Sequence, residues 1–131
     1  MTLNTTLGLT EARFLSQVQQ DVARALAEDI GDGDLTASLI DAQRVSHARV
    51  IAREAAVICG RPWASEVMRQ AAPGCRIDWQ VEEGARCAPN QVLFTLSGPA
   101  RELLSAERTL LNFVQLLSAV ATKTAVFVDA V

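Results

Sequence analysis

The stretch LLSAERTLLNFVQLLSAVATKTAVFVDAV, residues 103–131, decides the fold of this 131-residue chain. Apolar or small side chains recur along it every three or four residues, which is the spacing of one face of an α-helix. This face consists of Leu103, Ala106, Leu110, Phe113, Leu117, Val120, Thr124, Phe127 and Val131. Further apolar residues widen it, so the sequence predicts one long helix with little polar surface.

A helix of this kind must lie between other elements, and few remain in the chain to surround it. The apolar pattern continues to Val131 without a glycine cap or a polar tail. We therefore expect the helix to be covered by another subunit or by the rest of a longer polypeptide.

Arg108 lies on the narrow polar ridge of this helix. The ridge consists of Ser105, Arg108, Asn112, Gln115 and Thr122. A helical arginine usually pairs with an acid three or four residues away, but those positions hold Leu104, Ser105, Leu111 and Asn112. One interpretation is that the guanidinium is held ready for a carboxylate or phosphate ligand. The other is that it pairs with an acid elsewhere in the fold, and these residues alone leave both open.

Helical and strand patterns follow one another before residue 103. Thr10 caps a predicted helix of about five turns, which ends near Asp29 and the glycines that follow it. A short helix capped by Asp34 or Thr36 is predicted over Leu35–Ile40, followed by a strand from Val45 with Ala48, Val50 and Ala52 on one face and a bend or bulge in Ala55–Cys59. The next predicted element is a helix from Pro62 to Pro73-Gly74. After it come a strand over Cys75–Val81, a turn over Glu82–Ala85 and a strand over Gln91–Leu96 closed by Ser97-Gly98-Pro99. Because there is no βαβ regularity, an α+β fold with a mainly antiparallel sheet is predicted.

Composition limits the function classes. With 50% hydrophobic and 21% charged residues, the chain is not a disordered tail and can form a core without disulfides. A net charge of -3 opposes binding to a polyphosphate backbone, so no nucleic-acid partner is expected. The longest uninterrupted apolar run, Ala55–Cys59, is too short for a bilayer, so no membrane association is expected. Because Cys59, Cys75 and Cys87 lack metal or redox spacing, a reduced cytoplasmic protein is predicted.

Two groups of polar residues raise the question of a metal site. Asp29, Asp32 and Asp34 form an acidic cluster, but the glutamate that closes a calcium loop is absent at the proper distance. Turn and cap chemistry accounts for these acids. His47 has no metal-ligating residue at ligand spacing and is expected to face solvent. The sequence therefore predicts no metal site in this chain.

Four segments together carry a resemblance to a known family. They are Glu28–Thr36 (EDIGDGDLT), Ala52-Arg53-Glu54 leading to Gly60, Val81–Gly84 (VEEG), and Glu107–Phe113 (ERTLLNF) followed by Leu117–Thr122 (LSAVAT). Their types and order resemble the N-terminal half of the quinolinate phosphoribosyltransferase family. One departure is Ala119, where the family commonly has glycine.

The resemblance implies an enzyme of NAD biosynthesis. Such an enzyme transfers phosphoribosyl from phosphoribosyl pyrophosphate to quinolinate with loss of CO2, giving nicotinate mononucleotide and pyrophosphate, and Mg2+ accompanies the pyrophosphate. The resemblance also implies a homodimer, in which the N-terminal α/β sandwich of one subunit covers the α/β barrel of the other. Arg108 matches the family's arginine that reaches across this interface to the anionic groups of the substrate. A pre-oriented arginine neutralises a dianionic pyridine dicarboxylate with little reorganisation.

The same resemblance divides the chain. Residues 1–115 correspond to the sandwich domain and residues 116–131 to the start of the connection into the barrel, which is absent. We therefore expect substrate-binding Arg108 but no catalytic residue, and we expect the chain to be a fragment that is inactive by itself. One alternative is a related phosphoribosyltransferase-like protein of molybdenum metabolism. Another is a non-catalytic dimerisation module, which would use the apolar helix and leave Arg108 without a ligand.

A carrier domain is a further class to consider. Residues 81–98 resemble the hairpins of biotinyl and lipoyl carriers, which need a lysine in the exposed turn. The only lysine, Lys123, lies on the C-terminal helix, so a carrier function is excluded.

Overall fold

The computed structural model describes residues 10–30 and 35–131. Its elements are α1 (Glu11–Ile30), α2 (Leu35–Ser38), β1 (Val45–Ile51), β2 (Ala56–Val57), α3 (Arg61–Ala71), β3 (Arg76–Trp79), β4 (Arg86–Cys87), β5 (Val92–Pro99) and α4 (Ala100–Ala130). The described strands pair only in antiparallel fashion, which confirms the predicted α+β class.

The main sheet has the strand order β1-β5-β3, with β5 in the middle. Strand β1 alternates as predicted, since Ala48 and Val50 are half-buried while His47 and Arg49 are exposed. The exposure of His47 agrees with the expectation of a solvent-facing histidine. The buried face of the sheet supplies Phe94, which is 0% exposed, to the core.

The sequence misplaced the end of one strand and missed a second, small sheet. Strand β5 does not close at residues 97–99, because Gly98 and Pro99 pair with Ser46 and Val45 of β1. Gly98 has a φ of 142°, and a Cβ there would lie 2.7 Å from the Cα of Cys75, so the strand passes too close to its neighbour for a side chain. The small sheet formed by β2 and β4 was not predicted at all.

The helices were predicted more accurately. Helix α1 has the expected five turns, although Leu15 is 57% exposed rather than part of its buried face. Helix α3 begins with Arg61 and Pro62 and ends before Pro73. Helix α2 ends at Ser38, two residues earlier than predicted. The two residues proposed to cap it, Asp34 and Thr36, lie outside the described side chains.

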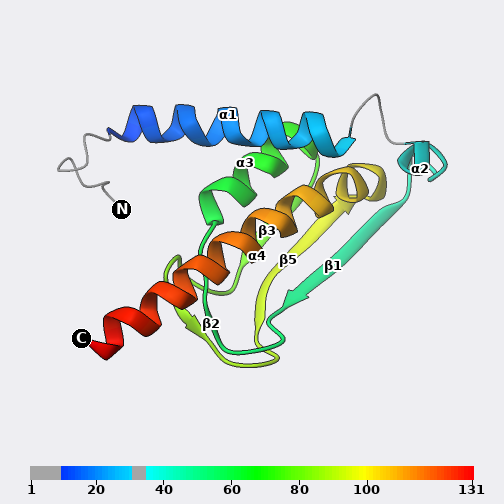
Figure 1. Ribbon diagram of the computed structural model, residues 1–131. Helices are drawn as coiled ribbons and strands as arrows, with labels where there is room; N and C mark the ends of the chain where they lie inside the picture. The colour runs from blue at the N-terminus through cyan, green and yellow to red at the C-terminus, as the bar shows by residue number, and fades with distance from the viewer. Residues whose placement is uncertain (1–9, 31–34) are drawn as a thin grey trace.

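Helix α4 connects all the layers of the molecule. Figure 1 shows it crossing the sheet diagonally, with α3 beside it and α1 packed beyond them. Its buried side chains are Ala100, Leu103, Ala106, Thr109, Leu110, Val114 and Ser118. The predicted apolar face is therefore confirmed from residue 103 to 110, but Val114 rather than Phe113 continues it.

The second half of α4 is largely uncovered in this chain. Val120, Val126, Phe127 and Val128 are between 58% and 66% exposed. This agrees with the expectation that too few elements remain to surround the helix. The helix passes through residues 115 and 116 without a break, so the proposed domain division there stays a prediction.

By length and composition, α4 is also the one helix in the described part of the chain that is long and apolar enough to cross a membrane. Its first half nevertheless forms the core, since Ala106 and Leu110 are 0% exposed. Core packing accounts for that part of its apolar composition, and the finding alone is weak evidence for a membrane span.

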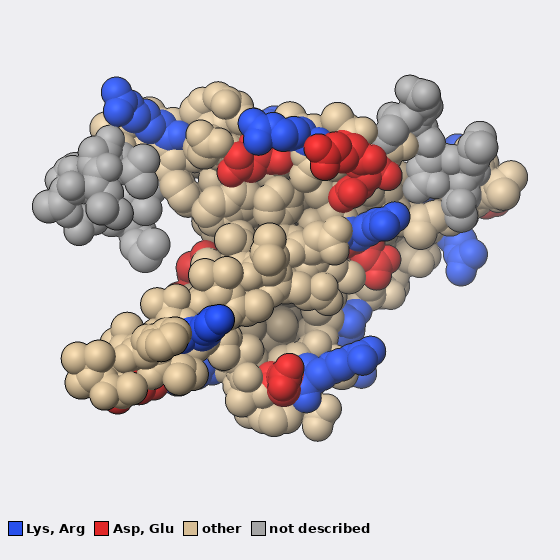
Figure 2. Space-filling model, viewed as in Figure 1, with Lys and Arg blue, Asp and Glu red and all other residues tan. Residues whose placement is uncertain are grey.

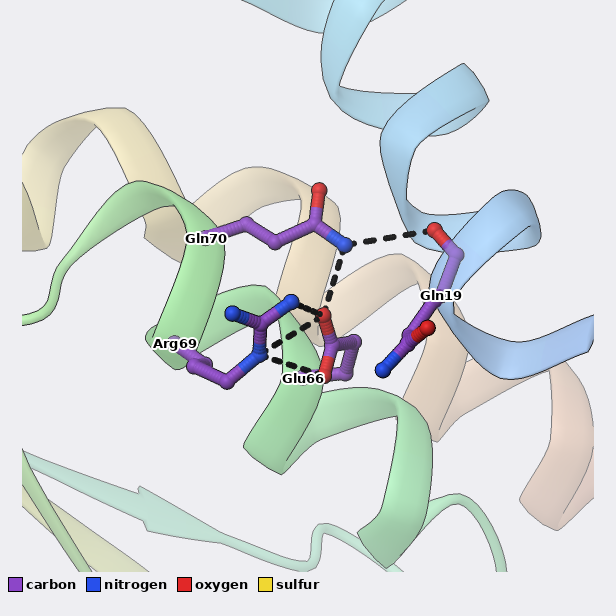
Figure 3. A network of polar contacts seen from close by, with 4 residues as sticks. All are labelled: Gln19, Glu66, Arg69 and Gln70. Carbon is purple, nitrogen blue, oxygen red and sulfur yellow. Dashed lines mark hydrogen bonds and ion pairs between the residues drawn. The ribbon is translucent and has the colours of Figure 1, made fainter. Parts of the chain in front are cut away.

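A half-buried carboxylate, Glu66, orders the polar contact between α3 and α1. Figure 3 shows Glu66 between Arg69 and Gln70, both from the same helix. Arg69 donates to Glu66 at 2.6 Å, and the Gln70 amide donates both to Glu66 at 2.6 Å and to the backbone oxygen of Gln19 in α1 at 3.2 Å. The hydrogen bond from Arg69 is the main cause that lowers the pKa of Glu66, while burial acts in the opposite direction.

This carboxylate predicts a pH dependence of stability. A glutamate whose pKa is lowered by folding stabilises the fold above its unfolded pKa of about 4.3, and the contribution is lost as pH falls through the folded value. We expect Glu66→Gln to reduce the difference in unfolding free energy between pH 7 and pH 3, measured by urea denaturation across this range. Glu54→Gln, at an exposed position, serves as the control. An unchanged pH dependence in Glu66→Gln would contradict the prediction.

Candidate substrate-binding site

Arg108 projects from an exposed position in the third turn of α4. It forms no hydrogen bond or ion pair with any residue in the described part of the chain. Its neighbour Ser105 donates its hydroxyl to the backbone oxygen of Arg101 instead. The sequence left two interpretations of Arg108 open. Among the described residues there is no ion pair between Arg108 and an acid, so within this part of the chain its guanidinium is free.

The residue next to it, Thr109, is buried and fixes α4 against α1. Thr109 is 1% exposed, and its hydroxyl donates to a carboxylate oxygen of Asp29 at 2.6 Å. Asp29 lies in the last turn of α1. The contact thus joins the EDIGDGDLT and ERTLLNF segments, which lie 80 residues apart in sequence. It also sets the rotation of the helix that carries Arg108.

Two grooves border α4 on either side of this turn. The smaller, of about 200 Å³, lies between α1 and α4 and includes Glu28, Asp29 and Asn112 in its lining. The larger, of about 610 Å³, lies between α4 and the strands, and Leu111 and Gln115 are among its lining residues. Arg108 lines neither groove.

Helical spacing nevertheless places Arg108 beside both. Residues three, four and seven positions apart share a helix face, and the corresponding positions after Arg108 are Leu111, Asn112 and Gln115. Leu111 and Gln115 line the larger groove, and Asn112 lines the smaller. Arg108 therefore lies on the ridge between the grooves, directly before Thr109, which lines the smaller one.

The larger groove also brings together other segments of the family pattern. Arg53 and Glu54, which follow β1, face Ser118, Ala119 and Thr122 across it. Ser118 holds the two sides together, because its hydroxyl accepts from the backbone nitrogen of Cys59 at 2.9 Å and donates to the backbone oxygen of the same residue at 3.1 Å. The substitution of Ala119 for the family's glycine thus lies on the wall of this groove.

The start of α3 is held by an acid from the VEEG segment. Gly60 has a φ of 117° and its nitrogen donates to the Glu83 carboxylate at 3.1 Å. A Cβ at Gly60 would lie 3.4 Å from the Cα of Val114, so the chain passes close to α4 at this point. Glu83 therefore has a structural function as a cap for α3.

The cysteines and acids in the described part of the chain do not form a nucleophilic or metal-binding site. Burial is the main cause that raises the pKa of both Cys59 and Cys75, with further contributions from Glu83 and Glu102 respectively, so these side chains are thiols rather than nucleophilic thiolates at neutral pH. The described residues include no group of three or more potential metal ligands. Of the acidic cluster considered above, Asp32 and Asp34 lie outside the described residues.

Comparison with known proteins identifies the family. The family described as "Quinolinate phosphoribosyl transferase, N-terminal domain" matches residues 34–118. The chain belongs to this family. The match confirms the resemblance carried by the four segments.

Relatives extend the similarity along the chain. It is 40% identical over 127 residues to "Nicotinate-nucleotide pyrophosphorylase [carboxylating]" from Mycobacterium leprae, covering 94% of this chain and 44% of the relative. It is 36% identical over 106 residues to a probable enzyme of the same name from Synechocystis, covering 81% of this chain and 36% of the relative. The chain thus spans less than half the length of these relatives.

Solved structures agree on the fold. The nicotinate-nucleotide pyrophosphorylase from Francisella tularensis is 39% identical, with a TM-score of 0.79 over 82% of this chain and 38% of that structure. NadC from Streptococcus pyogenes is 29% identical, with a TM-score of 0.81 over 88% of this chain and 42% of that structure. The α+β fold with its long C-terminal helix is therefore that of this family.

Sequence reasoning selected Arg108 but missed the contact beside it. Thr109 is a polar residue among the buried positions Ala106, Leu110 and Val114, and a polar side chain at such a position needs a partner. This signal was present in the helical pattern. The identity of the partner, Asp29, was not, because nothing in the spacing places the end of α1 against this turn.

The contacts of α4 predict that Thr109 contributes more to the stability of the fold than its neighbour Arg108. We expect Arg108→Ala to change the unfolding free energy of the chain by less than about 0.5 kcal/mol, because an exposed side chain without partners is lost. Thr109→Val is expected to lower it by about 1–2 kcal/mol, because a hydrogen bond to a charged group is lost. Urea denaturation of both variants at pH 7 measures this. A loss in Arg108→Ala as large as that in Thr109→Val would contradict the prediction.

Proposed function

We propose that this chain is the substrate-covering part of an enzyme that transfers phosphoribosyl from phosphoribosyl pyrophosphate to quinolinate with decarboxylation, forming nicotinate mononucleotide, pyrophosphate and CO2. The printed names of its relatives support this reaction. The chain spans less than half of their length, so by itself it is inactive.

The observation that carries the proposal is the unpaired guanidinium of Arg108 on a rigid helix. Quinolinate carries two carboxylates, and a guanidinium binds a carboxylate through two parallel hydrogen bonds. Because Thr109 fixes the rotation of α4, Arg108 is positioned before the substrate arrives. Its role is to bind and orient the anionic groups of quinolinate.

Mg2+ accompanies phosphoribosyl pyrophosphate in the proposed reaction. The described residues provide no acidic cluster that fits such an ion. The groups that bind it belong to the remainder of the enzyme, and no step through the metal is assigned to this chain.

The proposed enzyme is a cytoplasmic homodimer in which Arg108 acts on the active site of the partner subunit. Two features support an assembly of this kind. Arg108 is exposed and has no partner among the described residues, and the second half of α4 exposes Val120, Val126, Phe127 and Val128. Exposed apolar side chains of this number are typical of a surface that is covered on assembly.

The same exposed helix favours one rival, a dimerisation module without catalytic function. The two hypotheses differ in the role of Arg108, which binds substrate only in the enzyme. A second rival is a related phosphoribosyltransferase-like protein of molybdenum metabolism. No contact in the described part of the chain favours it over an enzyme that acts on quinolinate.

Activity measurements on a chimera test the proposal. In this chimera the chain replaces the matching region of the Mycobacterium leprae relative, and the unmodified relative is the positive control. We expect Arg108→Ala to lower kcat/KM for quinolinate by about 100-fold, because a partner of a desolvated ion pair is lost. Arg108→Lys retains the positive charge but not the two parallel N–H donors of the guanidinium, so an intermediate loss of kcat/KM is expected. Unchanged affinity for quinolinate in Arg108→Ala would favour the dimerisation module.

Mixed dimers test whether Arg108 acts across the interface. One subunit carries Arg108→Ala, and the other is inactivated in the part derived from Mycobacterium leprae. Each homodimer is expected to be inactive, whereas the mixed dimer regains part of the wild-type rate because one active site contains both intact parts. Confirmed heterodimers without recovered activity would show that Arg108 acts within its own subunit.

A further inference from the structure

The lack of an ion pair at Arg108 is unexpected beside α1. Two carboxylates, Glu28 and Asp29, lie in the last turn of α1 and line the groove that separates this helix from α4. The helix dipole opposes negative charge at that end, so these carboxylates favour any nearby cation or hydrogen-bond donor. Figure 2 shows acidic and basic side chains gathered over α1.

Asp29 is already occupied by a donor from α4. The Thr109 hydroxyl reaches its Oδ2 atom at 2.6 Å, and Thr109 itself is 1% exposed, so this hydroxyl is held in place by the core. Arg108 is the preceding residue, and Asn112, one turn further along the same face as Arg108, lines the groove together with Asp29. A long, flexible arginine side chain at this position borders the groove in which the carboxylate lies.

We infer that Thr109 is a positioning residue that keeps Arg108 available for the substrate by holding Asp29 away from it. The inference rests on the proposed function of Arg108 as the group that binds quinolinate. Without the hydroxyl, the Asp29 carboxylate loses its donor, and Arg108, the residue next to Thr109 on α4, can replace it. The internal ion pair then competes with the substrate for the same guanidinium.

Internal competition has a kinetic signature. When only a fraction of the enzyme has a free Arg108, the apparent dissociation constant rises in inverse proportion to that fraction. Saturating substrate displaces the carboxylate, so kcat stays at the wild-type value. Arg108→Ala also lowers kcat/KM, but removing Asp29 as well cannot restore it, because the substrate-binding group is gone. Restoration by the removal of Asp29 therefore tests the inference about Thr109 separately from the proposed function of Arg108.

The test uses Thr109→Val, which is isosteric and lacks the hydroxyl, in the chimera described above. We expect KM for quinolinate to rise about fivefold, the strength of a partly exposed ion pair, with kcat unchanged. Adding Asp29→Ala to this variant is expected to restore the wild-type KM, because the competing carboxylate is gone. Ser65→Ala, which removes a hydroxyl at an exposed position of α3, is the control and should leave both constants unchanged.

The outcomes are distinct. An unchanged KM in Thr109→Val would overturn the inference, and so would a raised KM that Asp29→Ala does not restore, because the hydroxyl would then have only a structural role. If Arg108→Ala leaves quinolinate affinity unchanged, the proposed function itself fails.

A second variant applies if Thr109→Val does not fold. Asn112→Asp places an unoccupied carboxylate at an exposed position four residues from Arg108, where the core is not disturbed. It is expected to raise KM for quinolinate without changing kcat, whereas Ser65→Asp, at an exposed position of α3 and with the same change in net charge, leaves KM unchanged. An unchanged KM in Asn112→Asp would show that a nearby carboxylate does not compete for Arg108.

Discussion

The fold depends on the burial of one face of α4, formed by Leu103, Ala106, Leu110 and Val114. This face contacts α3, the sheet and α1, so a single helix supplies the surface that all other layers cover. Burying each of the larger side chains stabilises the fold by roughly 1.5–3 kcal/mol. Because this packing occupies only the first half of α4, the second half remains available to other surfaces.

Apolar contact alone does not fix how a helix is rotated. Two buried polar residues on opposite sides of α4, Thr109 and Ser118, do so through directional hydrogen bonds to Asp29 and to the backbone of Cys59. They lie nine residues apart, so they hold the helix at two points. The direction in which Arg108 projects follows from these two contacts rather than from the residue itself.

The elements with a clear period could be predicted from the sequence, and those without one could not. The 3.6-residue period of α1 and the alternation in β1 gave nearly correct bounds, whereas β2 and β4 contain two residues each and leave no periodic signal. Ser97-Gly98-Pro99 has turn composition, yet pairing with β1 extends β5 through it. Arg108 was found from the acids missing on its own helix, but its environment depends on Asp29, which only the tertiary structure brings near.

An arginine that is held free for a ligand constrains the residues around it. Acids must be absent from the positions three and four residues away on its own helix, and here those positions hold Leu104, Ser105, Leu111 and Asn112. Acids brought near by the fold must be bound elsewhere, and Thr109 binds Asp29 from the buried face of the same helix turn. The carboxylate stabilises the packing of α1 on α4 only while it stays with the hydroxyl, so one contact both orders the fold and leaves the guanidinium without an internal partner. In the proposed function, stability and ligand binding are therefore coupled through a residue that does not itself touch the ligand.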